Sequence, residues 1–113
     1  MHYQLRPVAS TEGSAGKLIN LQDGRLSVGR DSSNDIVLSS DRASPFHATL
    51  IVEAGEYFLI DLGSTNGSFV NGEAIAGKRR FKAWDTLRFG DMEFEVLDPS
   101  GRRPTRSQPI VDD

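Results

Sequence analysis

The sequence predicts an all-β domain, and three observations support that fold class. Apolar and polar residues alternate with a period of two in several segments, as they do in strands whose alternate side chains face a core. Turn-forming residues, glycine above all, interrupt these segments at close spacing. No stretch sustains the 3.6-residue apolar period of a capped amphipathic helix.

The clearest alternation lies near the C-terminus. Leu87 and Phe89 share one face of a strand over 86–89, and a strand over 92–96 continues the same apolar face. Gly90-Asp91 between them predicts a two-residue hairpin turn, and glycine in the first position favours type II′.

A second hairpin is predicted from strands over 48–53 and 56–62, with Ala54-Gly55 between them. Shorter strands are expected over 2–6, 17–21, 25–28, 36–38, 69–70 and 77–81. About ten short strands in one domain predict two twisted sheets packed face to face, with the functional residues on loops at one end.

Composition limits the domain count and the classes of partner. The chain has 113 residues of which 37% are hydrophobic, which is enough for one packed domain, expected over about 1–98. After Asp98 the alternation stops, and prolines and arginines over 99–113 predict a flexible tail or linker. A net charge of -3 argues against a nucleic-acid coat, and no apolar run is long enough to span a membrane. Because the chain has no cysteine, we expect a cytoplasmic protein without disulfides.

Three loop segments concentrate small polar donors around one arginine. They are Gly29-Arg30, the segment 44–47 and the segment 63–67. If these loops meet at one end of the sandwich, Arg30 would lie beside the hydroxyls of Ser44 and Thr65. A planar guanidinium with neighbouring hydroxyls suits a phosphate, because arginine can bind two phosphate oxygens at once. The segments therefore predict a phosphate-binding site.

Catalysis is the competing interpretation of these loops. Ser44 and His47, with Asp61 or Asp35, could be read as a hydrolase triad, but the sequence has no G-x-S-x-G elbow to expose the nucleophile. The two histidines also lack metal-ligand spacing. We therefore predict no catalytic residues, no metal and no cofactor, and a binding protein rather than an enzyme.

Three motifs together resemble the forkhead-associated (FHA) domain family. They are Gly29-Arg30, Ser44-x-x-His47 and the segment from Asp61 to Gly72, and the resemblance covers about residues 5–97. It implies an eleven-stranded SMAD/FHA-like β-sandwich that binds phosphothreonine in partner proteins through loops at one end. The function implied is a non-catalytic signalling adaptor.

The resemblance also implies roles for single residues. Arg30 would pair with the phosphate, Ser44 and Thr65 would donate hydroxyls to it, and Asn66 would hydrogen-bond the ligand backbone. Arg42 would contact the third residue after the phosphothreonine and favour an acidic side chain there. The residues implied to support the site structurally are Gly29, His47, Gly67, Asn71 and Gly72.

One departure from the family pattern leaves an alternative open. Pro45 follows the motif serine, where the family usually has Arg, Lys or Asn, so one ligand donor is lost. The chain could then be a phosphate-independent scaffold with a degenerated pocket, which would bind through the sandwich face or the basic edge over 79–82. Phosphorylation of Thr105 or Thr11 could instead supply a ligand for self-association.

Overall fold

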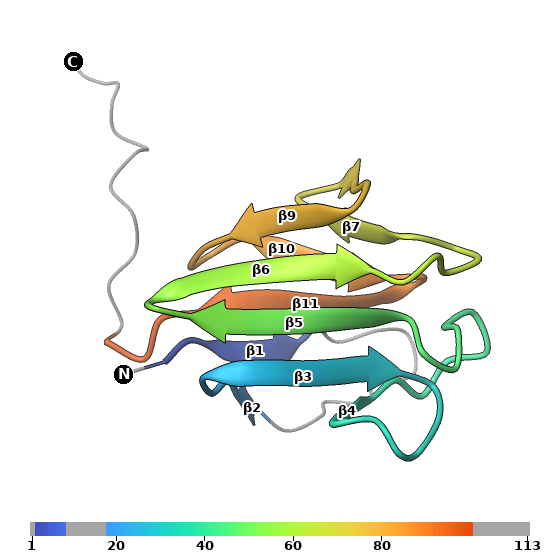
Figure 1. The fold of residues 1–113 in the computed structure, drawn as a ribbon, viewed down its shortest axis with the longest axis horizontal. Helices are drawn as coiled ribbons and strands as arrows, with labels where there is room; N and C mark the ends of the chain where they lie inside the picture. The colour runs from blue at the N-terminus through green and yellow to red at the C-terminus, as the bar shows by residue number, and fades with distance from the viewer. Residues whose placement is uncertain (1, 9–17, 101–113) are drawn as a thin grey trace.

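The computed structural model describes residues 2–8 and 18–100, and these residues form two β-sheets packed face to face (Figure 1). The described residues contain eleven strands, which confirms the predicted all-β sandwich. Nothing long and apolar enough to cross a bilayer as a helix occurs in these two ranges. Thr11, Thr105 and the predicted tail beyond Ser100 lie outside the described residues.

Each sheet has a simple order of neighbours. The six-stranded sheet runs β2 (Ile19–Asn20), β1 (Gln4–Pro7), β11 (Met92–Leu97), β10 (Thr86–Phe89), β7 (Ser68–Val70) and β8 (Glu73–Ala74). The five-stranded sheet runs β4 (Ile36–Val37), β3 (Gly24–Gly29), β5 (Ala48–Glu53), β6 (Glu56–Asp61) and β9 (Lys78–Phe81). All neighbours are antiparallel except β3 and β4.

The observed strands differ from the predicted ones mainly at their ends. The strand expected over 17–21 is only Ile19–Asn20, and the one expected over 2–6 is shifted to Gln4–Pro7. Strand β8 has no counterpart among the predicted strands, because two residues are too few to show alternation. Its pairing with β7 follows from the Asn71-Gly72 turn that joins them.

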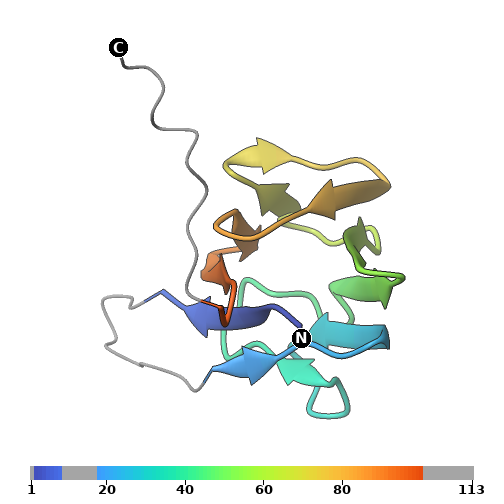
Figure 2. The same ribbon diagram turned by 90° about the vertical axis from the view of Figure 1, so that its left-hand side faces the viewer.

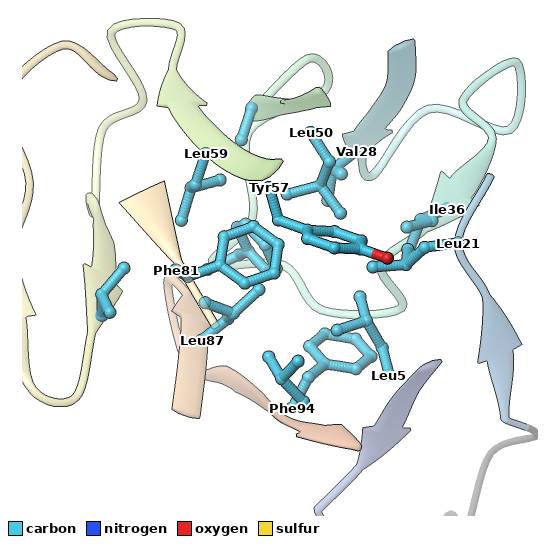
Figure 3. Packing of buried hydrophobic residues seen from close by; sticks show 14 of the residues in the cluster. Leu5, Leu21, Val28, Ile36, Leu50, Tyr57, Leu59, Phe81, Leu87 and Phe94 are labelled. Atoms are coloured by element: carbon cyan, nitrogen blue, oxygen red, sulfur yellow. The ribbon is translucent and has the colours of Figure 1, made fainter. Parts of the chain in front are cut away.

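The core lies between the inner faces of the two sheets. Leu5, Leu87 and Phe94 from the six-stranded sheet face Leu50 and Tyr57 from the five-stranded sheet (Figure 3). All five side chains are buried. The Tyr57 hydroxyl accepts a hydrogen bond from the backbone N–H of Tyr3 at 3.1 Å, so the polar end of this core residue is satisfied.

The functional loops gather at one end because of the strand directions. Strands β3 and β6 end there and the intervening antiparallel β5 begins there, so the loops at 30–35, 38–47 and 62–67 become neighbours (Figure 1). The β10–β11 turn joins them, because Gly90 donates its N–H to the Gly67 carbonyl at 2.9 Å. Figure 2 views the sandwich from the opposite end.

The hairpin turns have the predicted character. In the β10–β11 turn Gly90 has a φ of 64° and Asp91 has a negative φ, as a type II′ turn requires. In the β5–β6 turn both Ala54 and Gly55 have a positive φ, of 53° and 79°. Alanine in this left-handed conformation is strained, since its Cβ approaches the following carbonyl.

Replacement of Ala54 should therefore stabilise the domain. Asparagine tolerates a positive φ, so Ala54→Asn should raise the free energy of unfolding by about 0.5–1 kcal/mol in urea titrations. Ala76→Asn is the matched control, because Ala76 is also exposed and also precedes a glycine but has a negative φ. An equal gain in both variants would contradict the conformational explanation.

Candidate functional site

Arg30 lies directly after β3 and is hydrogen-bonded to the β4–β5 loop through both its backbone and its side chain. Its backbone N–H donates to the Ser44 carbonyl at 2.9 Å, and its side-chain Nε donates to the Ala43 carbonyl at 2.9 Å. The Nε contact orients the guanidinium but uses only one of its five N–H donors. Arg30 is exposed and makes no ion pair with a carboxylate in the described ranges. The terminal nitrogens are therefore available to an oxyanion.

Gly29 permits this attachment because it has no side chain. A Cβ at Gly29 would lie 2.1 Å from the carbonyl oxygen of Pro45 and 2.8 Å from Nδ2 of Asn34. Its φ is not positive, so the requirement for glycine comes from close packing alone. The Pro45 carbonyl accepts hydrogen bonds from the Asp31 N–H at 3.1 Å and from Asn34 Nδ2 at 2.8 Å.

The hydroxyls of Ser44 and Thr65 belong to two loops that are joined directly. The backbone N–H of Thr65 donates to Oγ of Ser44 at 3.2 Å. This contact uses the Ser44 hydroxyl as an acceptor, so its hydrogen stays available for donation. Ser44 is half-buried and Thr65 is exposed, so both residues are accessible at the end of the sandwich.

His47 joins the same two loops from within the protein. Its side chain is buried, its Nδ1 accepts from the Ser44 N–H at 3.0 Å, and its Nε2 lies 2.9 Å from the Gly67 carbonyl. Because Nδ1 is an acceptor, the neutral ring carries its hydrogen on Nε2 and donates it to Gly67. The imidazole ring therefore holds the segment with Ser44 against the segment that follows Thr65.

Asp61 organises the β6–β7 loop around one carboxylate. Its Oδ1 accepts from the hydroxyls of Ser64 and Ser68, both at 2.6 Å, and its Oδ2 accepts from the backbone N–H groups of Gly63 and Ser64, both at 3.0 Å. Burial opposes the charge, but these four hydrogen bonds together outweigh burial and lower the pKa of Asp61. The loop is thus built on a half-buried, ionised aspartate.

Asn66 and Arg42 are linked on the side of the site nearer the six-stranded sheet. The Asn66 side-chain nitrogen donates to the Arg42 carbonyl at 2.8 Å, while both residues remain exposed. The Arg42 carbonyl also lies against Gly90, where an added Cβ would approach it to 2.8 Å. One of the two N–H donors of the Asn66 amide is therefore engaged within the protein, and the second N–H and Oδ1 are left to a ligand.

The structure brings most of the predicted site residues together. Arg30, Ser44, Thr65, Asn66 and Arg42 lie on the loops at one end. Their neighbours there include Gly29, His47 and Gly67.

Asn71 and Gly72 lie elsewhere. Asn71 bonds Thr86 at the start of β10, whereas Gly67 bonds Gly90 after its end, so the turn sits at the far end of the β7–β10 ladder. In the described residues, no hydrogen bond of Asn71 or Gly72 reaches the site loops.

Two residues that organise the site had no predicted role. Asn34 donates through Nδ2 to the carbonyls of both Asp31 and Pro45, and Asp61 appeared only within a motif and as a rejected triad member. The sequence pattern around Asp61 indicates its role, because an aspartate shortly before Gly63-Ser64 is typical of a turn that is capped by the aspartate side chain. Nothing local marks Asn34, whose partner Pro45 is distant in sequence.

The geometry does not form a hydrolase triad from Ser44, His47 and Asp61. His47 bonds the backbone N–H of Ser44 and not its hydroxyl, and its Nε2 lies 3.9 Å from the Asp61 carboxylate, beyond hydrogen-bond distance. Asp35 is engaged with Ser27. A base that bonds no nucleophile cannot activate it, so these three residues are not arranged as a catalytic triad.

Near Arg30, one further carboxylate shapes the local charge. Asp31 accepts hydrogen bonds from both the hydroxyl and the N–H of Ser33, and these bonds, helped by the Arg30 charge, lower the pKa of Asp31. That carboxylate is directed to its own loop. The donors at the end of the sandwich are thus a guanidinium and two hydroxyls, a set that can bind an oxyanion.

Comparison with known proteins agrees with this geometry. A family model described as FHA domain matches residues 26–90, a range that contains all the loop residues above. The FHA domain-containing protein FhaB of Mycobacterium tuberculosis is 32% identical over 92 residues, which are 80% of this chain and 59% of that protein.

Two solved structures are similar throughout the sandwich. Mycobacterium tuberculosis EmbR in complex with a low-affinity phosphopeptide has a TM-score of 0.76 and 32% identity, and the alignment covers 85% of this chain and 24% of that one. The FHA domain of the CT664 protein from Chlamydia trachomatis has a TM-score of 0.79 and 30% identity, and covers 87% of this chain and 98% of that one.

Alanine at position 29 should break the attachment of Arg30. Because the added Cβ would meet backbone and not a flexible side chain, Gly29→Ala should lower the free energy of unfolding by about 2–3 kcal/mol. Gly63→Ala is the control, since Gly63 has a φ of 77° but no atom near an added Cβ, and should cost only about 1 kcal/mol. A smaller loss for Gly29→Ala than for Gly63→Ala in urea titrations would contradict the packing requirement.

The Asp61 carboxylate should make the domain sensitive to acid. A group whose pKa is lowered by folding adds stability above its ordinary pKa, near 4, and loses it as the pH falls through the lowered value. Asp61→Asn would turn an amide nitrogen toward two donors, so it should cost about 1–3 kcal/mol at pH 7, and the cost should fall as the pH is lowered below about 4. Urea unfolding at neutral and at acidic pH tests this, with the exposed Asp41→Asn as control. A loss that is independent of pH would refute the role of the charge.

Proposed function

This chain belongs to the FHA domain family, whose model covers more than half of it, and from that membership we propose that it is a non-catalytic module that binds phosphothreonine in a partner protein. One observation carries the proposal. The Arg30 guanidinium is anchored through Nε to the Ala43 carbonyl, beside the joined Ser44 and Thr65 loops, with its terminal nitrogens uncommitted in the described residues. Such a preorganised donor set favours a phosphate dianion, which has three strong acceptor oxygens.

Each donor has one proposed role. Arg30 pairs with the phosphate through its terminal nitrogens, and the hydroxyls of Ser44 and Thr65 complete the oxygen ligands. Asn66 contacts the ligand backbone through its side-chain amide, which the Arg42 carbonyl orients. The Arg42 side chain is exposed beside it and takes an acidic third residue after the phosphothreonine. His47 acts from behind, by positioning the loop and not by touching the ligand.

Pro45 is compatible with this function. The loop uses the Pro45 carbonyl, which accepts from Asp31 and Asn34, and a proline retains that carbonyl. What is lost is a polar side chain toward the ligand. We therefore expect phosphate recognition to be kept and the contacts around it to be fewer, with an affinity of about micromolar.

The relatives of this chain are longer than the matched domain. The chain spans 59% of the length of FhaB and 24% of the EmbR chain, so the proposal concerns the FHA module and not the activities of those longer proteins. The bound phosphopeptide of EmbR supports a phosphorylated ligand for this chain as well. A folded unit over about 1–98 and a cytoplasmic location remain predictions.

Loss of the guanidinium should abolish binding without unfolding the domain. In fluorescence anisotropy with a phosphothreonine peptide mixture of random flanks, Arg30→Ala should weaken binding at least about thirtyfold, or ~2 kcal/mol. Arg25→Ala is the matched control, because Arg25 is an exposed arginine at the other end of β3. Thermal unfolding should be nearly the same for both variants.

The unphosphorylated peptide mixture separates the two candidate functions. The proposed site binds only the phosphorylated form. Equal binding of both forms, unaffected by Arg30→Ala, would instead establish a phosphate-independent scaffold. The basic edge offers less for such a role, because Arg79 and Arg80 are paired with Glu73 and Glu56, and Lys78 lies over the Phe58 ring at 4.4 Å.

A further inference from the structure

Exposed apolar side chains concentrate beside the phosphate-binding loops. Among the described residues, five large hydrophobic side chains are exposed, and three of them are Val37 (50%), Phe46 (56%) and Leu62 (51%). Phe46 is two residues after Ser44, and Leu62 is three residues before Thr65. We call these three side chains the apolar row. Clusters of exposed apolar residues beside a polar site commonly mark a surface that a partner covers.

The register of the five-stranded sheet places the row across its end. Val37 of β4 is the partner of Gly29 in β3, and the segment that precedes β5 lies against Gly29 through the Pro45 carbonyl. On the other side, Leu62 donates its N–H to the His47 carbonyl at 3.0 Å, which extends the β5–β6 ladder. The row therefore crosses β4, β3, β5 and β6 at the end that carries the site.

All three side chains point away from the core. In β4 Ile36 is buried and Val37 is exposed, so Val37 is directed away from the core. In the same way Asp61 turns inward to its serines, and Leu62 after it is exposed. The His47 ring is turned into the protein, so Phe46 is the side chain that this segment presents to solvent. Solvent covers all three in the unbound domain.

The apolar row and Arg42 lie on opposite sides of Arg30 and Ser44. Arg42 is tied to Gly90 and Asn66, on the side of the six-stranded sheet, whereas the row belongs to the five-stranded sheet. An extended ligand that crosses the site with its later residues near Arg42 has its earlier residues on the side of the row. Pro45, between Ser44 and Phe46, adds no polar group to this side.

We infer that the apolar row binds an apolar side chain that precedes the phosphothreonine in the same partner. The inference rests on the proposed function and adds to it a second recognition element, on the side where Pro45 removes a polar contact. The occupant is thus a segment with a large aliphatic or aromatic residue before the phosphothreonine. An acidic or polar residue there would leave the row exposed and would gain nothing from it.

A positional scan tests this inference. The probe is a phosphothreonine peptide with alanine at all neighbouring positions, and leucine is placed in turn at each position on both sides. We expect leucine at one position before the phosphothreonine to raise the affinity about fivefold to tenfold. Phe46→Ser and Leu62→Ser should each remove most of that gain and change binding of the all-alanine peptide by less than about twofold.

The control variant is Leu18→Ser. Leu18 is exposed to 48%, close to the value of Leu62, but lies before β2 in the other sheet. It should keep the full gain. Thermal unfolding of all variants shows whether each is folded, and an unfolded Phe46→Ser leaves Leu62→Ser to decide.

Several results would overturn the inference. If the all-alanine peptide binds but no leucine before the phosphothreonine improves it, or only a leucine after it does, the row is not part of the peptide site. A gain in affinity from leucine that both serine variants retain would also show that the row is not part of the peptide site. Sedimentation of the chain alone identifies the competing occupant, since a dimer that Phe46→Ser abolishes would assign the row to a second copy. Failure of every phosphopeptide, the all-alanine one included, would remove the proposed function together with this inference.

Discussion

The binding end depends on the imidazole ring of His47. Its Nδ1 accepts from the backbone of Ser44 and its Nε2 donates to the backbone of Gly67, so one rigid ring fixes the separation of two loops. The ring is fully buried and contacts Phe89 edge to face, with ring centroids 5.9 Å apart. The ring therefore anchors the Ser44 and Gly67 loops to the core, so these loops are held along their length and not only at their ends.

The remaining constraints follow from backbone groups and not from side-chain ion pairs. Arg30 and Asp31 bond the carbonyls of Ser44 and Pro45, and Gly67 bonds Gly90. Backbone contacts of this kind tolerate changes of side chain at positions such as 45, where only the carbonyl is used. They do not tolerate an atom inserted between the two segments, and a Cβ at position 29 would be such an atom. The domain can thus keep its site while the ligand contacts around it vary.

Charge is distributed so that an anion can approach a protein that is itself acidic. The chain has a net charge of -3, yet the carboxylates of Asp31 and Asp61 accept hydrogen bonds from donors in their own loops. Asp61 accepts four hydrogen bonds within its own loop, and Asp31 accepts two from Ser33. Arg30 has no carboxylate ion-pair partner in the described ranges, so its positive charge remains available to an anion at the site.

The sandwich could be predicted from the amino-acid sequence, because alternation with a period of two and glycine turns are local properties of the chain. The same patterns predicted Arg30, Ser44 and Thr65 on loops, since each follows or precedes an apolar strand. Which loops touch one another becomes visible in the folded domain alone, where Asn34 bonds Pro45, Asn66 bonds Arg42, and Asn71 lies away from the site. These relations depend on strand order and register across two sheets, and no pattern within a single segment encodes them.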